Sequence, residues 1–149
     1  QGDDSVVSTN ISAVLQGGLG EDTISANGDS RNILVGGRGA DTLRGGSGED
    51  ILIGGQTSHD VDGRFSHDLA LWKILQEWNS DSAYLDRTEN IRRGAGAILS
   101  GAGISLSKGS TVFDDLEQDS LSGLGGLDWY FANEAEDLIK NRRKGELLN

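Results

Sequence analysis

The sequence predicts an all-β fold in which very short parallel strands stack in successive coils, interrupted by a two-helix insertion. A nine-residue pattern recurs in the N-terminal third of the chain, and each copy ends with one large aliphatic residue. Glycine accounts for 23 of the 149 residues, about twice its usual share, which suits tight turns between short strands. The pattern then stops and apolar residues recur at helical spacing.

The repeat is clearest in three segments that fit G-G-x-G-x-D-x-U-x, where U is a large aliphatic residue. These segments are 17–25, 36–44 and 45–53, and the last two abut. A weaker copy over 27–35 carries Gly28, has Asn32 where Asp is expected, and keeps the phase if Ala26 is one inserted residue. Degenerate copies at both ends of the chain keep only some of the Asp and aliphatic positions. One copy of such a pattern would indicate only a turn, but three copies in phase indicate a repeat architecture.

This nonapeptide resembles that of the RTX (repeats-in-toxin, haemolysin-type calcium-binding) family. The resemblance implies a right-handed parallel β-roll, the calcium β-roll, in which two repeats form one coil and several Ca²⁺ ions bind between turns. It also implies a module of a larger secreted bacterial protein that leaves by type I secretion and folds on extracellular Ca²⁺, which gives stability and secretion competence. The stretch 54–132 resembles a variant, C-terminal-type RTX ending with a helical insertion.

The charge of the stacked turns favours calcium on physical grounds. Coils stack about 4.8 Å apart, and two carboxylates at that distance repel by roughly 3.5 kcal/mol at an effective dielectric constant of about 20. A cation midway would lie about 2.4 Å from each layer, which suits Ca²⁺–oxygen distances and exceeds those of Mg²⁺. The chain has no Cys and only 2 His, so zinc and copper sites are not expected.

The predicted ligands are carboxylates and backbone carbonyls of the repeat turns. The first to be named are Asp22, Asp41 and Asp50, with the carbonyls of Gly18, Gly20, Gly37, Gly39, Gly46 and Gly48. The further candidates are Asp4, Asn32, Asp60, Asp119, Asp128 and Asp137. Asp60 arrives one residue late and is expected to reach the ion under the Asp41 turn. For Asp4, Asn32, Asp119 and Asp137, a plain turn role remains an open alternative to metal ligation.

The predicted organisation has four parts: β-roll coils over 1–60, a helical insertion packed on the roll over 61–94, irregular strands and final degenerate coils over 95–140, and a polar tail over 141–149. The insertion is expected to contain helices over 68–78 and 81–93, with Ser66 and Ser80 as N-caps and Gly94 as the stop. Leu71, Trp72, Leu75 and Trp78 either pack on the roll or form an exposed face that docks a partner. Packing is preferred, because short helices need tertiary contacts to persist.

Composition excludes several function classes. The net charge of −11 argues against nucleic acid and anionic membranes as partners, and no apolar run approaches the length of a membrane span. P-loop, dinucleotide-binding, H-E-x-x-H and G-x-S-x-G motifs are absent, so no enzymatic activity is predicted. The lack of any Met, a start residue included, leads us to expect a mature fragment or an excised module.

The expected location is therefore secreted, extracellular or at the cell surface, and the expected partners are calcium and the remainder of a larger parent chain. An alternative is a self-associating adhesive or structural building block that pairs through the ends of the roll, because open sheet edges invite pairing.

Overall fold

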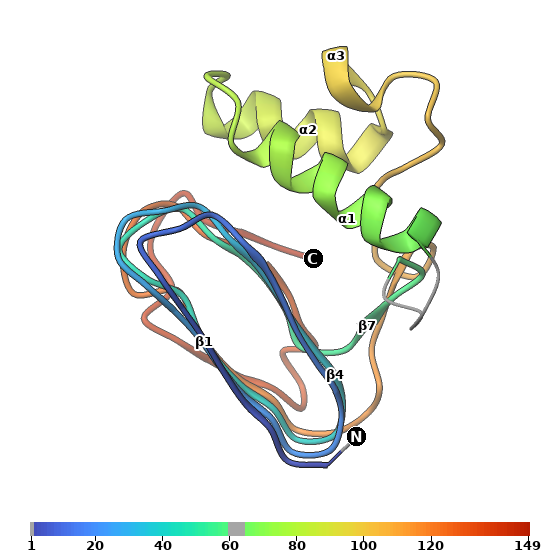
Figure 1. Ribbon diagram of the computed structural model, residues 1–149. Coiled ribbons are helices and arrows are strands. Elements are labelled where there is room, and N and C mark those ends of the chain that lie inside the picture. Colours follow the sequence, from blue (N-terminus) through green and yellow to red (C-terminus); the bar gives the residue numbers. More distant parts are fainter. Residues whose placement is uncertain (1, 60–64) are drawn as a thin grey trace.

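The computed structural model describes residues 2–59 and 65–149, and its strands form two five-stranded parallel sheets (Figure 1). Sheet A has the order β1-β3-β5-β9-β11 and consists of Ser5–Thr9, Thr23–Asn27, Thr42–Arg44, Ser120–Ser122 and Leu138–Lys140. Sheet B has the order β2-β4-β6-β10-β12 and consists of Val14–Leu19, Ile33–Arg38, Ile51–Ile53, Trp129–Phe131 and Leu147–Leu148. Along the chain, consecutive strands of these two sheets alternate between them, which accords with the predicted stack of short parallel strands.

One core lies between the two sheets and is built by the aliphatic position of each repeat. Ile24 pairs in register with Leu43 in sheet A, and Leu34 with Leu52 in sheet B. These four side chains are completely buried, so the predicted core is confirmed. The same positions continue in Leu15, Leu121 and Tyr130, and the cluster also contains Ala26 and Ala132.

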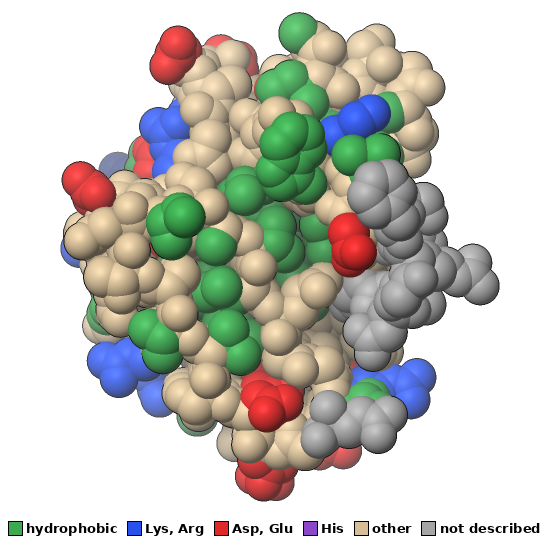
Figure 2. Space-filling model, viewed as in Figure 1, with side chains coloured by type: hydrophobic (Ala, Val, Ile, Leu, Met, Phe, Trp, Pro, Cys, Tyr) green, Lys and Arg blue, Asp and Glu red, His purple; other side chains and the backbone are tan. Residues whose placement is uncertain are grey.

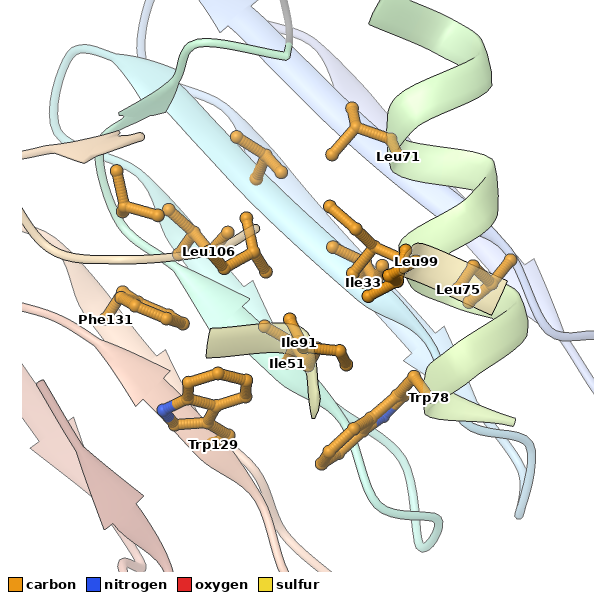
Figure 3. Packing of buried hydrophobic residues seen from close by; sticks show 14 of the residues in the cluster. Ile33, Ile51, Leu71, Leu75, Trp78, Ile91, Leu99, Leu106, Trp129 and Phe131 are labelled. Atoms are coloured by element: carbon orange, nitrogen blue, oxygen red, sulfur yellow. The ribbon is translucent and has the colours of Figure 1, made fainter. Parts of the chain in front are cut away.

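A second core lies on the outer face of sheet B, where the helices pack. The helices are α1 (Phe65–Trp78), α2 (Tyr84–Arg93) and α3 (Gly96–Leu99). Figure 3 shows Leu71, Leu75 and Trp78 of α1 directed toward Ile33 and Ile51 of the sheet. Burying these apolar surfaces supplies stabilisation that the thin inter-sheet core lacks.

The expected packing of the first helix holds for three of its four named side chains. Leu71, Leu75 and Trp78 are buried, whereas Trp72 is 53% exposed. Trp72 borders a groove between α1 and β2 that Val14 also lines. Hydrophobic side chains gather on this face of the molecule (Figure 2).

The helix starts differ from the sequence prediction, whereas the second helix stops where expected. Helix α1 begins at Phe65, before the Ser66 expected as its cap. Helix α2 begins after Ala83, without a side-chain cap, so Ser80 is not its N-cap either. Gly94 ends α2 in the left-handed conformation with φ 62°, which glycine adopts readily. Helix α3 lies where irregular strands were expected, because its four residues carry no helical period.

The segment with the helices leaves and re-enters the sheets through a short stem. Strand β7 (Gln56–Thr57) pairs antiparallel with β8 (Val112–Phe113). After β8 the parallel register resumes, so that Leu121 pairs with Leu43 and Tyr130 with Leu52. The C-terminal segment expected as a polar tail contains β12, which pairs with β10. None of the helices in the described ranges has the length and apolarity needed to cross a bilayer.

Candidate functional site

Two ladders of residues run along the turns that join the sheets. The A-side turns lead into sheet A, and the residue before each strand there forms the A-side ladder: Asp4, Asp22, Asp41, Asp119 and Asp137. The B-side turns lead into sheet B, and the corresponding B-side ladder is Ala13, Asn32, Asp50, Asp128 and Glu146. The strand register places the members of each ladder in adjacent coils.

In the A-side ladder, one carboxylate oxygen of each Asp after Asp4 accepts a hydrogen bond from the backbone of the preceding coil. The N–H of Asp22 donates to Oδ1 of Asp41 at 2.7 Å, and the N–H of Asp41 donates to Oδ1 of Asp119 at 2.8 Å. Asp4 and Asp119 make the equivalent bonds to Asp22 and Asp137. The prediction that stacked carboxylates only repel is therefore incomplete, since each also forms a charge-assisted hydrogen bond.

The second oxygen of three of these carboxylates has no such partner, whereas Oδ2 of Asp137 accepts the N–H of Asn133 at 2.7 Å. Oδ2 of Asp22, Asp41 and Asp119 is buried without a hydrogen bond, and each residue is only 1% exposed. A buried carboxylate oxygen with no partner costs several kcal/mol by general estimates. These three atoms therefore require a cation or a proton to be stable.

Backbone carbonyls border these oxygens because the first residue of each turn is glycine. A Cβ on Gly17 would overlap Oδ2 of Asp22 and the carbonyl oxygen of Gly36. A Cβ on Gly36 would likewise overlap Oδ2 of Asp41 and the carbonyl oxygen of Gly54. Each such cradle gathers a carboxylate and a carbonyl oxygen, the hard donors that Ca²⁺ prefers. The residues present thus fit a calcium ion.

The protonation behaviour of the ladder follows from its burial. Burial raises the pKa of Asp41 and of Asp119 to about 7, although a backbone N–H on each carboxylate acts in the opposite direction. Burial likewise raises the pKa of Asp128 to about 8, and it raises the pKa of Asp50. In each case burial penalises the charged form more than the hydrogen bonds favour it.

The B-side ladder has the same backbone bonds but fewer free carboxylate oxygens. The N–H of Asn32 donates to Oδ1 of Asp50, and that of Asp50 donates to Oδ1 of Asp128, both at 2.8 Å. The first position is Ala13, and the second is an amide that bonds Ser30 O and Asp50 Oδ1. Oδ2 of Asp50 accepts the N–H of Gly46, which leaves Oδ2 of Asp128 as the one ladder oxygen of this side found without a partner among the described residues.

The structure brings most of the predicted site residues together in adjacent turns. A Cβ on Gly37 would overlap the carbonyl oxygen of Gly18, and one on Gly39 would overlap that of Gly20, so these turns stack in close contact. Gly46 and Gly48 stack in the same way on Gly28 and Ser30. Of the remaining candidates, all but Asp60 belong to the two ladders.

Asp60 lies outside the described residues, and the position next to Asp41 is taken by Asp119. The two residues are 78 positions apart, whereas the ladder neighbours Asp22 and Asp41 are 19 apart. The third A-side turn therefore starts at Gly54 and ends at Asp119, with the stem and helices between. The matching Gly-Gly at the start and Asp at the end were visible in the sequence, but their adjacency required the register.

Sequence reasoning missed two ladder residues and the glycines that lie against the ladder. It named the second and fourth glycines of each repeat, whereas the first glycines (17, 36, 45, 54 and 123) lie against the Asp Oδ2 atoms. It also missed Glu146, which is 5% exposed and follows Asp128 in the B-side ladder. Ala13 gave no signal, because it carries no polar group.

The ladder differs from a site built wholly of side chains. Within the described part of the chain, no group of three or more His, Cys, Asp or Glu side chains is arranged to hold a metal ion. Each A-side turn contributes one ladder carboxylate, so carbonyl oxygens would have to complete the coordination. The chain is thus a repeat protein with stacked acidic turns.

Comparison with protein families identifies the repeats. Residues 12–30 and 27–57 match the family model described as RTX calcium-binding nonapeptide repeat (4 copies). The segment 12–57 thus consists of RTX calcium-binding nonapeptide repeats. Comparisons with curated proteins and with solved structures gave no match.

Proposed function

We propose that the chain is a calcium-binding module in which the two sheets form a right-handed β-roll and several Ca²⁺ ions bind along the acidic turns. The observation that carries this proposal is the row of buried Oδ2 atoms at Asp22, Asp41 and Asp119, which lack hydrogen-bond partners. Bound calcium would supply the positive charge that these oxygens need. The role is one of binding and folding, not catalysis.

The chain's own groups prepare each site. The bond from a backbone N–H to Oδ1 fixes the carboxylate and directs Oδ2 toward the glycine cradle. The absence of a Cβ at Gly36 lets the carbonyl oxygen of Gly54 approach the same space. Because charged carboxylates are costly to bury unpaired, the fold and the ion are thermodynamically coupled.

The biological setting follows from the family. RTX repeat proteins are typically secreted by bacteria, and extracellular calcium modules bind in the range of about 10⁻⁴ to 10⁻³ M. We propose that the module belongs to a larger secreted or cell-surface protein, stays loosely folded where calcium is scarce, and folds outside the cell after type I secretion. Folding there would stabilise the protein and prevent its return through the export channel.

The test is a titration of the 149-residue chain with CaCl₂ and, separately, with MgCl₂, followed by far-UV circular dichroism and calorimetry. We expect β-structure to form with millimolar calcium and not with magnesium, with more than one ion bound. The triple variant Asp22→Asn, Asp41→Asn and Asp119→Asn should lose most of the bound calcium, whereas the exposed control Asp81→Asn should not. A spectrum that is fully folded in chelator and unchanged by calcium would refute the proposal.

A second candidate function is self-association as an extracellular building block. Strands β1 and β2 lie at the same end of the two sheets and each pairs with one neighbour within its sheet, and Val7 and Ile11 near them are 59% and 61% exposed. Exposed strand edges of this kind favour pairing with another chain. Sedimentation velocity with and without calcium distinguishes the two candidates, because a monomer under all conditions argues against assembly.

A further inference from the structure

Helices α1 and α2 make their polar contacts with the roll mainly at the B-side turns. The indole N–H of Trp78, the last residue of α1, donates to the backbone carbonyl of Glu49 at 2.8 Å. Trp78 is completely buried, and the guanidinium of Arg87 lies over its ring at 5.0 Å. Glu49 directly precedes the ladder residue Asp50, so this contact fixes a B-side turn.

The side chain of Glu49 extends the same anchor. Its carboxylate accepts a hydrogen bond from Arg87 of α2 and forms an ion pair with Arg31 at 3.0 Å. Arg31 in turn donates to the carbonyl of Ser80, between the two helices. The Arg87 side chain is 3% exposed and that of Glu49 is 22% exposed, so salt screens this pair less than a fully exposed one. Two successive B-side turns are thus tied to the helices.

Tyr84, the first residue of α2, bridges the next two coils. Its hydroxyl donates to the carbonyl of Asp128 at 2.8 Å and accepts the backbone N–H of Leu147 at 3.0 Å. Burial raises the pKa of Tyr84 to about 12, so the hydroxyl stays protonated and keeps donating at neutral pH. The bridge joins the Asp128 turn to the coil that carries Glu146.

The A-side turns receive no such support from the helices. Among the described residues, no hydrogen bond or ion pair joins a residue of α1, α2 or α3 to the A-side turns over 20–22, 39–41 and 132–137. The inserted segment reaches these turns only outside its helices: Oδ2 of Asp115 accepts the N–H of Gly39 at 2.8 Å, and Lys108 donates to the carbonyl of Ala132 at 2.9 Å. The A-side is also the side on which three of the four unpartnered ladder oxygens lie.

We infer that α1 and α2 act as a metal-independent clamp on the B-side turns, so that calcium orders chiefly the A-side turns. This inference rests on the proposed calcium function and adds that the two sides of the roll are ordered in different ways. Side-chain bridges from Trp78, Arg87 and Tyr84 hold the B-side coils to the helices, whereas the unpartnered carboxylate oxygens of the A-side turns are left to ions. The clamp would keep the B-side turns partly ordered in the calcium-free chain, and the rest of the roll would fold onto them when calcium binds.

The experiment is residue-resolved amide hydrogen exchange of the 149-residue chain in EDTA and in CaCl₂. The probes are the N–H groups of Asp50 and Trp129 on the B-side, and those of Asp41 and Thr42 on the A-side. We expect the B-side probes to be protected in EDTA and the A-side probes to gain at least tenfold in protection when calcium is added. Equal gains on both sides would overturn the clamp yet leave the calcium function intact, whereas no gain on either side would refute the calcium function.

A variant pair tests the clamp itself. Tyr84→Phe removes the hydroxyl that serves Asp128 and Leu147 while keeping the ring, so B-side exchange in EDTA should rise roughly tenfold, as expected for the loss of buried hydrogen bonds. Leu85→Ala changes a neighbouring residue of α2 that is 64% exposed and should leave exchange unchanged. Number and affinity of the ions bound on the A-side should be the same in both variants. Unchanged B-side exchange in a folded Tyr84→Phe variant would overturn the inference.

Discussion

The A-side and B-side ladders share one backbone geometry but differ in the side chains that fill it. All five A-side positions are Asp, whereas the B-side positions are Ala, Asn, Asp, Asp and Glu. On the A-side, three buried carboxylate oxygens lack partners. On the B-side, the Asn32 amide bonds Ser30 O and Asp50 Oδ1, and Oδ2 of Asp50 accepts the N–H of Gly46. One coil can therefore be joined to the next either by ions or by protein groups.

Asn32 illustrates the second way within the same molecule. Its amide keeps the acceptor for the backbone N–H of Ala13 and replaces the second carboxylate oxygen by a donor, which bonds Ser30 O at 2.8 Å. An Asn at a ladder position therefore needs no cation. It follows that the charge of the ladder, and not the stacking itself, creates the demand for calcium.

The largest effect is expected where glycine keeps the cradle open. Gly36→Ala would push a methyl group into Oδ2 of Asp41 and the carbonyl of Gly54, so we expect a loss of about 3 kcal/mol or more in stability and of calcium binding at this turn. Gly45→Ala meets Asp50 Oδ2 and Gly123 O on the B-side and should lower stability without removing A-side ions. Urea unfolding in calcium and calorimetry measure both quantities.

The control for these variants is Gly101→Ala. Gly101 has φ +75° and no atom within 4 Å of an added Cβ, so its substitution carries only the backbone strain of about 1–2 kcal/mol. If Gly36→Ala costs no more than this control, the cradle is not as tight as described.

The next effect contrasts one Asp from each ladder. Asp41→Asn keeps the acceptor for the N–H of Asp22 and removes the buried charge, so the chain should become more stable in EDTA and lose about 2 kcal/mol of the stabilisation that calcium gives. Asp50→Asn should change the calcium response far less, since Oδ2 of Asp50 already accepts the N–H of Gly46. Urea unfolding of both variants in EDTA and in CaCl₂ gives the four free energies of unfolding. If both variants lose the same amount of calcium-dependent stabilisation, the proposed difference between the A-side and the B-side is contradicted.

The pH dependence should be opposite with and without calcium. Burial raises the pKa of Asp41 and Asp119 from 3.8 to about 7, so the calcium-free fold binds protons more tightly than the unfolded chain. Its stability is then fully present below about 4 and is lost as the pH rises through 7. Protons compete with the ion for the same oxygens, so calcium affinity should fall as the pH decreases below 7.

Urea unfolding in EDTA and calcium titrations at pH 8.5, 7.0 and 5.5 measure these trends. The Asp41→Asn variant should show a smaller pH effect in EDTA than the unchanged chain. Stability in EDTA that rises with pH through 7 would show that the A-side carboxylates are not buried as described.

The repeat could be predicted from the sequence because each coil is specified locally. The aliphatic residue at a fixed place in each copy predicted the stacked core of Ile24, Leu34, Leu43 and Leu52, and the Asp before each strand predicted most ladder positions. The adjacency of Asp41 and Asp119 could not be read in this way, because it depends on how a long intervening segment returns to the sheets. Asp60 was the nearest Asp in sequence, and sequence proximity was a poor guide to the register.

The helices were predictable in type but not in their role. The apolar period indicated α1 and α2, and Gly94 marked the end of α2. Both expected serine caps were wrong, because packing of Tyr84 and Trp78 against the B-side turns decides where the helices lie, and a cap motif says nothing about such tertiary contacts. The anchoring by Glu49 was equally hidden, since its position in the repeat accepts any residue.

The smallest effect separates the two arginines that contact Glu49. The side chain of Arg31 is 31% exposed and that of Arg87 only 3%, so water screens the first pair far more than the second. Arg31→Gln should cost about 0.5 kcal/mol, as for a surface ion pair, and leave A-side calcium binding unchanged. Arg87→Gln should cost several times more, because it leaves Glu49 facing the helices with its buried partner removed and takes the guanidinium from the ring of Trp78. Urea unfolding in EDTA measures the loss of stability in each variant. Equal losses would mean that the contact of Arg87 with Glu49 contributes no more than that of the more exposed Arg31, which would contradict the clamp.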